Sequence, residues 1–340
     1  MQHTPLLTDS REDIARAAAL LREGARVGIP TETVYGLAAN AFDGQAVAGI
    51  FAAKGRPMDN PLIVHIADVS QWDALVAEIP DKARALAEAF WPGPLTVILP
   101  HSDRIPPQVS AGLSTVAVRL PAHPLARAII AEAGCPLAAP SGNRSGSPSP
   151  TTAAHMLADM DGRIAAIVEG GDCAVGVEST VGSVLAGRVR LLRPGGVTLE
   201  MLRSVVGEVE TDRAVTEQLA EGAVAASPGM KYKHYAPAAR VTLVRGDAAA
   251  TAAYMNGFAG QKGVYALCFD GEEQAVRLPS LTYGARDDAA AQARAVFAAL
   301  RRFDDMKAER VLAACPSCEG MGLAVYNRLI RAAAFEVVDV

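Results

Sequence analysis

The chain has few cysteines and few aromatic residues. Five cysteines are scattered over 340 residues, and Phe, Trp and Tyr together make up 5% of the sequence. An odd number of dispersed cysteines does not fit a disulfide framework and favours reduced thiols. Cys315 and Cys318 are the one close pair. Because no second Cys/His pair lies at metal spacing, a redox or half-zinc role is the minor alternative for them.

The chain also has no surplus of positive charge. The formal net charge is −5, and Lys plus Arg count 17 against 20 Asp plus Glu in residues 1–207 and 15 against 17 beyond. Neither half is a basic module, which argues against binding nucleic acid by bulk electrostatics, although a local basic patch remains possible. The sequence contains no apolar run long enough to cross a bilayer, and residues 1–13 do not read as a signal peptide. We therefore expect a cytoplasmic protein that does not bind a membrane.

Two nucleotide-binding motifs are missing as well. The sequence contains neither Gly-x-x-x-x-Gly-Lys-Ser/Thr nor Gly-x-Gly-x-x-Gly. A phosphate ligand would therefore have to be held by another arrangement of cations, hydroxyls and backbone N–H groups.

The length and the alternation of expected elements predict two α/β domains joined by a linker. Residues 1–207 read as helices packed on a sheet, and residues 239–340 repeat a β-α-β pattern typical of a small, mainly parallel, doubly wound domain. Between them, residues 208–238 include the aromatic and basic run 227–237, which we expect to fold back over a site. The sequence does not indicate an oligomeric state.

The segment from Lys54 to His65 combines two cations, a glycine and two prolines with an apolar end. Proline fixes φ and lacks an N–H, so residues 55–61 should form a rigid loop that leads into a strand at 62–66. We expect a helix over 42–53 that leaves Lys54 just beyond its C-terminus. A rigid cationic loop suits an anionic ligand such as a phosphate, although an ordinary solvated loop is the commoner outcome for such a pattern.

Two further segments point to a polar site. Residues 140–151 are rich in Ser, Gly and Pro, which is typical of a flexible linker. They follow an expected strand and precede an expected helix, however, and such a junction can bind phosphate. A strand over 115–120 places Arg119 opposite the larger apolar residues, so Arg119 needs an anionic partner. A helix is also expected over 71–76, and a strand opening at Val177.

These features resemble the two-domain threonylcarbamoyl-AMP synthases of the YrdC type. The resembling segments are 30–41, 54–66, 91–99, 115–124, 138–151, 177–180, 192–195 and 227–237. The resemblance implies a YrdC-like twisted α/β sheet with flanking helices and a concave active site, plus a small C-terminal Rossmann-like domain. It also implies a nucleotidyltransferase that forms threonylcarbamoyl-AMP and pyrophosphate from L-threonine, bicarbonate and ATP. That product supplies the tRNA threonylcarbamoyl-transferase machinery, which makes threonylcarbamoyladenosine.

The same resemblance implies roles for individual residues. Catalytic roles fall to Lys54, Arg56, Ser141 and Asn143, the residues of the Lys-x-Arg and Ser-x-Asn motifs that form the signature of this family. Contacts to L-threonine fall to Thr33, His65, Arg119, the backbone of Ala139, and Ser179. Contacts to ATP fall to Arg56, Asn60, Thr115, Ser141, Ser149, Arg193 and Tyr232. Mg²⁺ is expected with ATP, without a dedicated all-protein metal site.

The chemistry of these residue types agrees with that reaction. The amine of threonine captures carbon dioxide as a carbamate, which is already anionic, so no carboxylate base is required. Lys54, Arg56 and Arg193 then offset the negative charge that builds on the phosphates. A guanidinium such as that of Arg119 can donate two parallel hydrogen bonds to a carboxylate. Two alternatives remain at this point. One is a nucleic-acid-binding module, and the other is the larger carbamoyltransferase of hydrogenase maturation, whose acylphosphatase-like region and paired Cys-x-x-Cys motifs this chain lacks.

Overall fold

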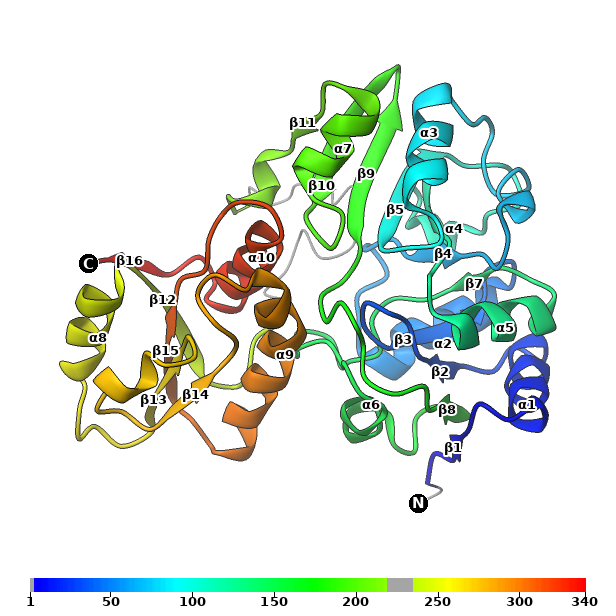
Figure 1. The fold of residues 1–340 in the computed structure, drawn as a ribbon. Helices are drawn as coiled ribbons and strands as arrows, with labels where there is room; N and C mark the ends of the chain where they lie inside the picture. The colour runs from blue at the N-terminus through cyan, green and yellow to red at the C-terminus, as the bar shows by residue number, and fades with distance from the viewer. Residues whose placement is uncertain (1–2, 219–234) are drawn as a thin grey trace. The chain divides into compact units, whose positions relative to one another are not determined.

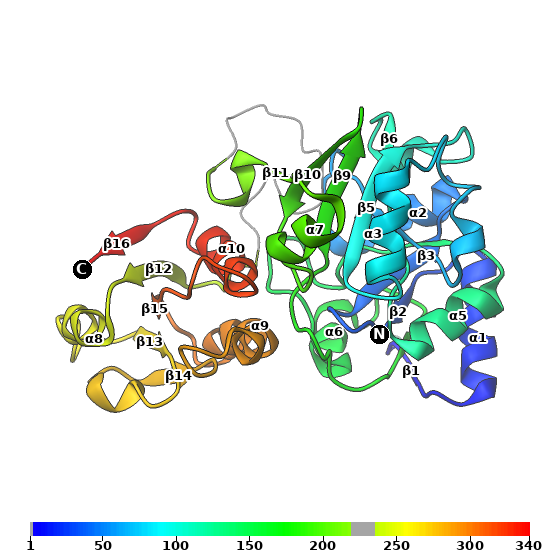
Figure 2. The ribbon, with the colours of Figure 1, turned by 45° about the horizontal axis from the view of Figure 1, so that its top comes forward.

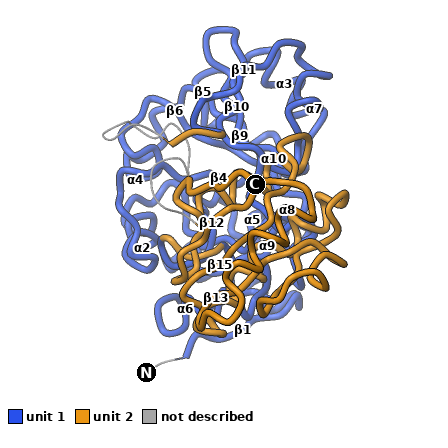
Figure 3. The backbone as a smooth tube through the Cα atoms, turned by 90° about the vertical axis from the view of Figure 1, so that its left-hand side faces the viewer, with its two compact units in different colours: residues 1–145, 149–215, 219–231 blue, residues 146–148, 216–218, 232–340 orange. Residues whose placement is uncertain are grey.

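A computed structural model of the chain describes residues 3–218 and 235–340. The described chain divides into two compact units. Unit 1 contains residues 3–145 and 149–215, and unit 2 contains residues 146–148, 216–218 and 235–340 (Figure 3). In these described parts, no helix is both long and apolar enough to cross a bilayer.

Unit 1 is built on a mixed sheet of 11 strands in the order β1-β8-β2-β3-β7-β4-β6-β5-β9-β10-β11 (Figure 1). The strands are β1 (Leu6–Leu7), β2 (Val27–Ile29), β3 (Gly36–Asn40), β4 (Ile63–His65), β5 (Leu95–Pro100), β6 (Thr115–Arg119), β7 (Leu137–Ala138), β8 (Ala166–Val168), β9 (Thr180–Leu185), β10 (Arg188–Arg193) and β11 (Glu210–Thr211). In register, Ile63 pairs with Ala117 and His65 with Arg119 in the parallel β4–β6 pair.

The helices of unit 1 begin and end at residues that the sequence marks clearly. They are α1 (Arg11–Arg22), α2 (Gly44–Lys54), α3 (Asp81–Phe90), α4 (Pro107–Ser110), α5 (Pro124–Ala133), α6 (Ala153–Met160) and α7 (Leu199–Val206), with 3-10 turns η1 (Val69–Gln71) and η2 (Arg213–Val215). The hydroxyl of Ser10 accepts from the N–H of Asp13 and caps α1. Gly55, at φ 64°, ends α2 in the left-handed conformation that glycine adopts without strain.

The two faces of this sheet are covered differently. On one face, α2, α3 and α7 pack over residues such as Val64, Val97 and Val118 in a large apolar core. On the other face, α1 and α5 pack together over β2, β3 and β8, and they lie side by side in Figure 2. Because successive side chains of a strand alternate, the second face of β4, β5, β6, β9 and β10 carries polar residues and a small apolar patch that includes Ile98 and Leu192.

Unit 2 holds a five-stranded sheet in which every pair is parallel, in the order β14-β13-β15-β12-β16. Its strands and helices are β12 (Arg240–Arg245), α8 (Ala248–Asn256), β13 (Val264–Cys268), η3 (Glu273–Ala275), β14 (Ser280–Thr282), α9 (Ala289–Asp305), β15 (Arg310–Ala314), α10 (Gly322–Ala332) and β16 (Val337–Asp339). Helices alternate with parallel strands, as in a doubly wound domain. The prediction of a mainly parallel sheet here is confirmed.

Three local predictions are wrong. Residues 71–76 do not form a helix, because the carboxylate of Asp68 caps the short turn η1 and Trp72 then packs against Trp91 at 4.6 Å between ring centroids. Lys54 is the last residue of α2 instead of lying beyond it. The strand expected to open at Val177 begins at Thr180, where pairing with β5 starts.

The Cys315–Cys318 pair follows β15 in unit 2. Burial raises the pKa of both thiols above the ordinary value, so neither is a thiolate near neutral pH. Within residues 3–218 and 235–340, no group of three or more His, Cys, Asp or Glu side chains is arranged to hold a metal ion.

Candidate active site

Lys54 joins two segments that are far apart in the sequence. Its ammonium donates to the backbone carbonyls of Ser141 and Asn143, the second at 2.5 Å, and its side chain is buried. The carbonyl of Lys54 in turn accepts from the N–H of Ser145 at 2.9 Å. The end of α2 therefore fixes the loop after β7, and the Lys-x-Arg and Ser-x-Asn motifs lie together.

The loop over 140–151 is an ordered turn instead of a flexible linker. The hydroxyl of Ser141 donates to Oδ1 of Asn143 at 2.6 Å, and Nδ2 of Asn143 donates to the carbonyl of Arg144 at 2.7 Å. An antiparallel bridge also pairs Ser141 with Gly36, beside the Thr31–Gly36 turn. These bonds hold the signature side chains in one local geometry.

Arg56 and Asn60 form the rigid loop that follows α2. The Arg56 guanidinium donates from Nη2 to the carbonyls of Asn60 and Pro61, at 3.2 Å each, which closes the loop on itself. The side chain of Asn60 is fully buried, and neither atom of its amide has a hydrogen-bond partner among the described residues. A buried amide without a partner is unusual in a folded protein, and a bound ligand or an ordered water would complete it.

Arg119 lies at the centre of a buried polar network on the second face of the sheet. Its Nη2 lies 2.6 Å from Oε1 of Glu32, its Nη1 donates to the hydroxyl of Thr33 at 2.8 Å, and its Nε donates to the carbonyl of Gly93 at 3.2 Å. Burial by itself would raise the pKa of Glu32, but the Arg119 charge holds that pKa below the ordinary value. The prediction that Arg119 needs an anionic partner is confirmed, and the partner is Glu32.

His65 stands opposite Arg119 in the β4–β6 pair. Burial, reinforced by the Arg119 charge, lowers the pKa of His65 to about 3, so its ring is neutral near neutral pH. Its Nδ1 has no hydrogen-bond partner in the described chain. The ring can therefore offer a ligand a neutral nitrogen and no charge.

Ser179 and Arg193 lie together where β9 begins and β10 ends. Arg193 donates from Nε to the carbonyl of Ser179 at 3.0 Å and from Nη2 to its hydroxyl at 3.2 Å, and that hydroxyl is also 2.8 Å from Oγ1 of Thr96. Beside them, the hydroxyl of Ser149 donates to the carboxylate of Glu178. All five side chains are buried.

The remaining predicted residues fall in different places. The N–H of Ala139 donates to the carbonyl of Ile63 at 2.9 Å, which ties the backbone of Ala139 to the start of β4. Thr115 lies at the far end of β6 from Arg119 and lines a separate cavity of about 250 Å³ with Arg188 and Arg190. Thr115 is therefore not brought to the Arg119 network, and Tyr232 lies outside the described residues.

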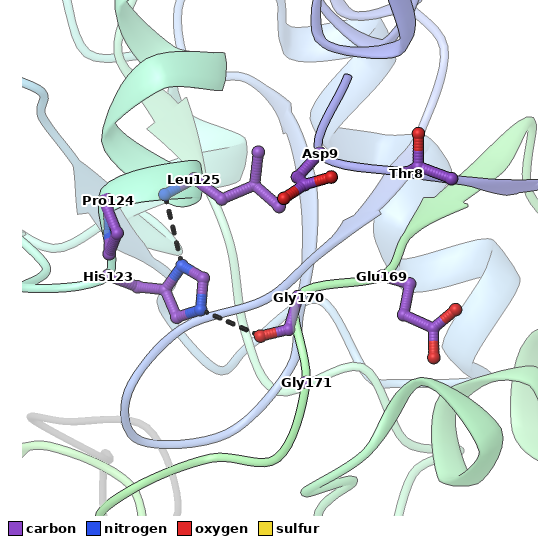
Figure 4. A pocket seen from close by; sticks show the side chains of 8 residues that line it. All are labelled: Thr8, Asp9, His123, Pro124, Leu125, Glu169, Gly170 and Gly171. Atoms are coloured by element: carbon purple, nitrogen blue, oxygen red, sulfur yellow. Dashed lines mark hydrogen bonds between the residues drawn. The ribbon is translucent and has the colours of Figure 1, made fainter.

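A larger cavity, of about 420 Å³, lies apart from the predicted site residues. It is lined by Thr8, Asp9, His123, Pro124, Leu125, Glu169, Gly170 and Gly171 (Figure 4). Nδ1 of His123 accepts from the N–H of Leu125 at 3.2 Å, so Nε2 carries the proton and donates to the carbonyl of Gly170 at 3.2 Å. This geometry explains the His123 side chain as a local cap of α5.

Sequence reasoning missed two buried carboxylates of this region, Glu32 and Glu178. In the sequence Glu32 lies within Thr31–Gly36, a run of small hydroxyls, one carboxylate and one phenol closed by a glycine, and the need of Arg119 for an anion is the signal that points to it. Glu178 directly precedes Ser179, and nothing in its spacing marks it. Both contact a residue that the sequence did predict, Arg119 and Ser149 respectively.

Comparisons with known proteins fit this geometry. A family model described as "Telomere recombination" (Sua5_yciO_yrdC) matches residues 19–195, and one described as "Threonylcarbamoyl-AMP synthase, C-terminal domain" matches residues 197–334. The threonylcarbamoyl-AMP synthase of Bacillus subtilis is 46% identical, over 98% of this chain and 97% of its own length. The chain belongs to the threonylcarbamoyl-AMP synthase family.

Other members of the family extend the likeness. The threonylcarbamoyl-AMP synthase of Pyrococcus abyssi is 43% identical, over 95% of both chains. The crystal structure of P. abyssi Sua5 complexed with L-threonine matches this fold with a TM-score of 0.93 at 42% identity, over 99% of both chains. The resemblance stated from the sequence motifs is therefore confirmed, as is the two-part fold that it implied.

Proposed function

We propose that this chain is an L-threonylcarbamoyladenylate synthase, a nucleotidyltransferase that forms threonylcarbamoyl-AMP and pyrophosphate from L-threonine, bicarbonate and ATP. The observation that carries the proposal is the contact of the buried Lys54 ammonium with the Ser141 and Asn143 carbonyls. It unites the two signature motifs of the family in one part of unit 1. Full-length relatives that bear the same name support it.

In this proposal one set of residues binds L-threonine and a second set binds ATP. Thr33, His65, Arg119, the Ala139 carbonyl and Ser179 would surround L-threonine, and a crystal structure of the P. abyssi relative holds that amino acid. Arg56, Asn60, Ser141, Ser149 and Arg193 would meet ATP, together with Tyr232. Thr115, which lines the separate cavity, is assigned to ATP by the family resemblance alone. The Asn60 amide, which has no partner among the described residues, supports this division because a nucleotide can supply both a donor and an acceptor.

The chemical step is one of positioning and charge. The carbamate of threonine is an anionic nucleophile, and its oxygen attacks the α-phosphorus of ATP while pyrophosphate leaves. Lys54, Arg56 and Arg193 offset the charge on the phosphates. A Mg²⁺ ion would accompany the nucleotide, and the oxygens of Glu178 and Ser149 are the hard ligands that this part of the chain offers to it. When bound, the ion neutralises phosphate charge.

The product would then serve as a substrate for the machinery that transfers threonylcarbamoyl groups to tRNA. We do not propose that this chain binds tRNA tightly, because its net charge of −5 gives it no overall surplus of positive charge. A filter-binding assay should therefore detect at most weak, salt-sensitive tRNA binding.

The direct test is mass spectrometry of the product. The purified chain, incubated with ATP, L-threonine and ¹³C-labelled bicarbonate, should form threonylcarbamoyl-AMP that carries the label, and pyrophosphate release should depend on both threonine and bicarbonate. Lys54→Ala and Arg56→Ala should abolish that release. The matched controls are Lys82→Ala and Arg84→Ala in α3, whose side chains lie outside the network and should leave turnover intact. Retained turnover in the Lys54 and Arg56 variants would contradict the assigned roles.

A further inference from the structure

The hydroxyl of Thr33 has a fixed hydrogen-bond direction. Oγ1 of Thr31 lies 2.6 Å from the carbonyl of Val34, which only accepts, so the single hydrogen of Thr31 goes there. The Thr33 hydroxyl, 2.9 Å from Oγ1 of Thr31, must therefore donate to Thr31. Because Arg119 Nη1 already donates to Thr33, only an acceptor position remains on Thr33 for a ligand. Thr33 thus requires a donor, such as an amine or a hydroxyl.

Glu32 offers a second acceptor beside Thr33. It is 9% exposed, its Oε1 lies 2.6 Å from Arg119 Nη2, and the backbone N–H of Ala122 helps to keep the pKa of the carboxylate low, although no well-aligned hydrogen bond from the described residues satisfies either oxygen. A buried carboxylate is stable only when its oxygens are satisfied, and neighbours that make no well-aligned hydrogen bond leave part of that need unmet. Its oxygens therefore suit a donor that carries positive charge.

Arg119 supplies the opposite polarity at the same place. Two N–H groups of the Arg119 guanidinium donate to Gly93 and Thr33, whereas its Nη2 lies 2.6 Å from Glu32 without an aligned hydrogen bond and can donate to a ligand carboxylate. Arg119 therefore presents hydrogen-bond donors, and the neighbouring Glu32 and Thr33 present acceptors. An α-amino acid carries the complementary charges, a carboxylate and an ammonium on one carbon.

We infer that the Glu32 carboxylate is the subsite for the α-amino group of the substrate, with Thr33 as a second acceptor, so that Glu32 and Arg119 together recognise an amino-acid zwitterion. This inference rests on the proposed function and adds a binding residue to it. Glu32 acts as a charged acceptor and not as the base, because the close Arg119 guanidinium keeps its carboxylate ionised and weakly basic. The amine loses its proton to solvent before it captures carbon dioxide.

The test compares two ligands that differ in the amine alone. L-Threonine and β-hydroxybutyrate both carry a carboxylate and a β-hydroxyl, but only threonine has the α-amino group. Ligand-observed NMR titrations of the full chain without ATP would give a dissociation constant for each. In Glu32→Gln, the constant for threonine should rise roughly tenfold to a hundredfold. The constant for β-hydroxybutyrate should stay within about a factor of three.

A second substitution and a control distinguish direct binding of the amine by Glu32 from a role in which Glu32 only holds Arg119 in place. Glu32→Asp keeps the charge on a shorter arm and should retain the preference for threonine over the hydroxy acid. Glu169→Gln replaces an exposed glutamate of the cavity in Figure 4 and should change neither constant. If Glu32→Gln weakened both ligands equally, Glu32 would only hold Arg119 in place. If it weakened neither, the subsite would not exist. Either result overturns the inference.

Failure of this inference can be told apart from failure of the proposed function. If the wild-type chain formed labelled threonylcarbamoyl-AMP while Glu32→Gln kept the full preference for threonine, only the subsite would be wrong. If Glu32→Gln lost that preference while the wild type formed no adenylate, the amino-acid subsite would stand and the proposed reaction would fall.

Discussion

His65 couples the candidate site to the pH dependence of stability. Its pKa is about 3 in the folded chain against an ordinary value of 6.5, because burial and the neighbouring Arg119 disfavour the charged ring. Below pH 6.5 the unfolded chain therefore binds a proton at His65 that the folded chain does not bind, and the free energy of unfolding falls as the pH falls from 6.5 toward 3. At pH 5 this penalty amounts to about 2 kcal/mol.

Replacing the imidazole should remove this penalty. We expect the unfolding free energy of His65→Asn to depend less on pH than that of the wild type between pH 7 and pH 5, by about 2 kcal/mol. Urea unfolding followed by tryptophan fluorescence measures this in unit 1, because Trp72 and Trp91 are the two tryptophans of the chain and both lie there. If the unfolding free energies of the two proteins changed equally with pH, the pKa of His65 would be the same in the folded and unfolded states.

Single residues also mark the limit of what the sequence could predict. Alternation along β6 was enough to place Arg119 on the polar face and to require an anion beside it. It could not identify Glu32, because the two residues lie far apart in the chain and meet only through the packing of the sheet. The partners of Lys54 are likewise backbone carbonyls, which no side-chain pattern reveals.

At the scale of elements, the turn after β10 controls the position of Arg193. A Cβ on Gly195 would lie 2.3 Å from the N of Thr180 and 2.6 Å from the carbonyl O of Glu178, both backbone atoms that cannot rotate away. We expect Gly195→Ala to push this turn off the start of β9, to weaken ATP binding, and to cost unit 1 about 1 to 3 kcal/mol of stability.

A second glycine provides the matched control for that change. Gly182 lies within β9, and a Cβ there would meet only the Arg190 carbonyl oxygen, at 3.8 Å, which is an ordinary contact. Gly182→Ala should therefore leave ATP affinity and fluorescence-detected unfolding nearly unchanged. Equal effects of the two substitutions would show that the close approach at Gly195 does not set the geometry of the site.

The elements predicted correctly are those whose local pattern and tertiary burial agree. The strand predicted over 115–120 alternates between clear breaks, and the structure contains it as β6 (Thr115–Arg119). No helix forms over 71–76, because an irregular turn buries Trp72 and Leu75 in the large core. The apolar spacing of these two residues is compatible with such a turn as well as with a helix. The short strand β14 lacked a long apolar run and was missed.

At the scale of the whole molecule, unit 1 continues beyond α7, which ends at Val206. Val209 and Ala214 are 3% and 2% exposed, and Ala214 packs on the apolar patch of the second sheet face with Ile98 and Leu192. The N–H of Asp212 also donates to the carbonyl of Leu191 at 2.9 Å. Residues 207–215 are therefore a packed part of unit 1 and contribute to its stability.

Two truncations separate that contribution from a role of the predicted linker. A chain that ends at Val206 loses Val209 and Ala214, so unit 1 should unfold with a free energy lower by about 2 to 3 kcal/mol. A chain that ends at Gln218 keeps both and should show wild-type tryptophan-detected unfolding. Because both chains lack the segment we expect to fold over the site, both should bind ATP more weakly. Unchanged ATP affinity in the chain ending at Gln218, with weaker binding only in the shorter one, would mean that the shorter truncation damages unit 1 and that no lid exists.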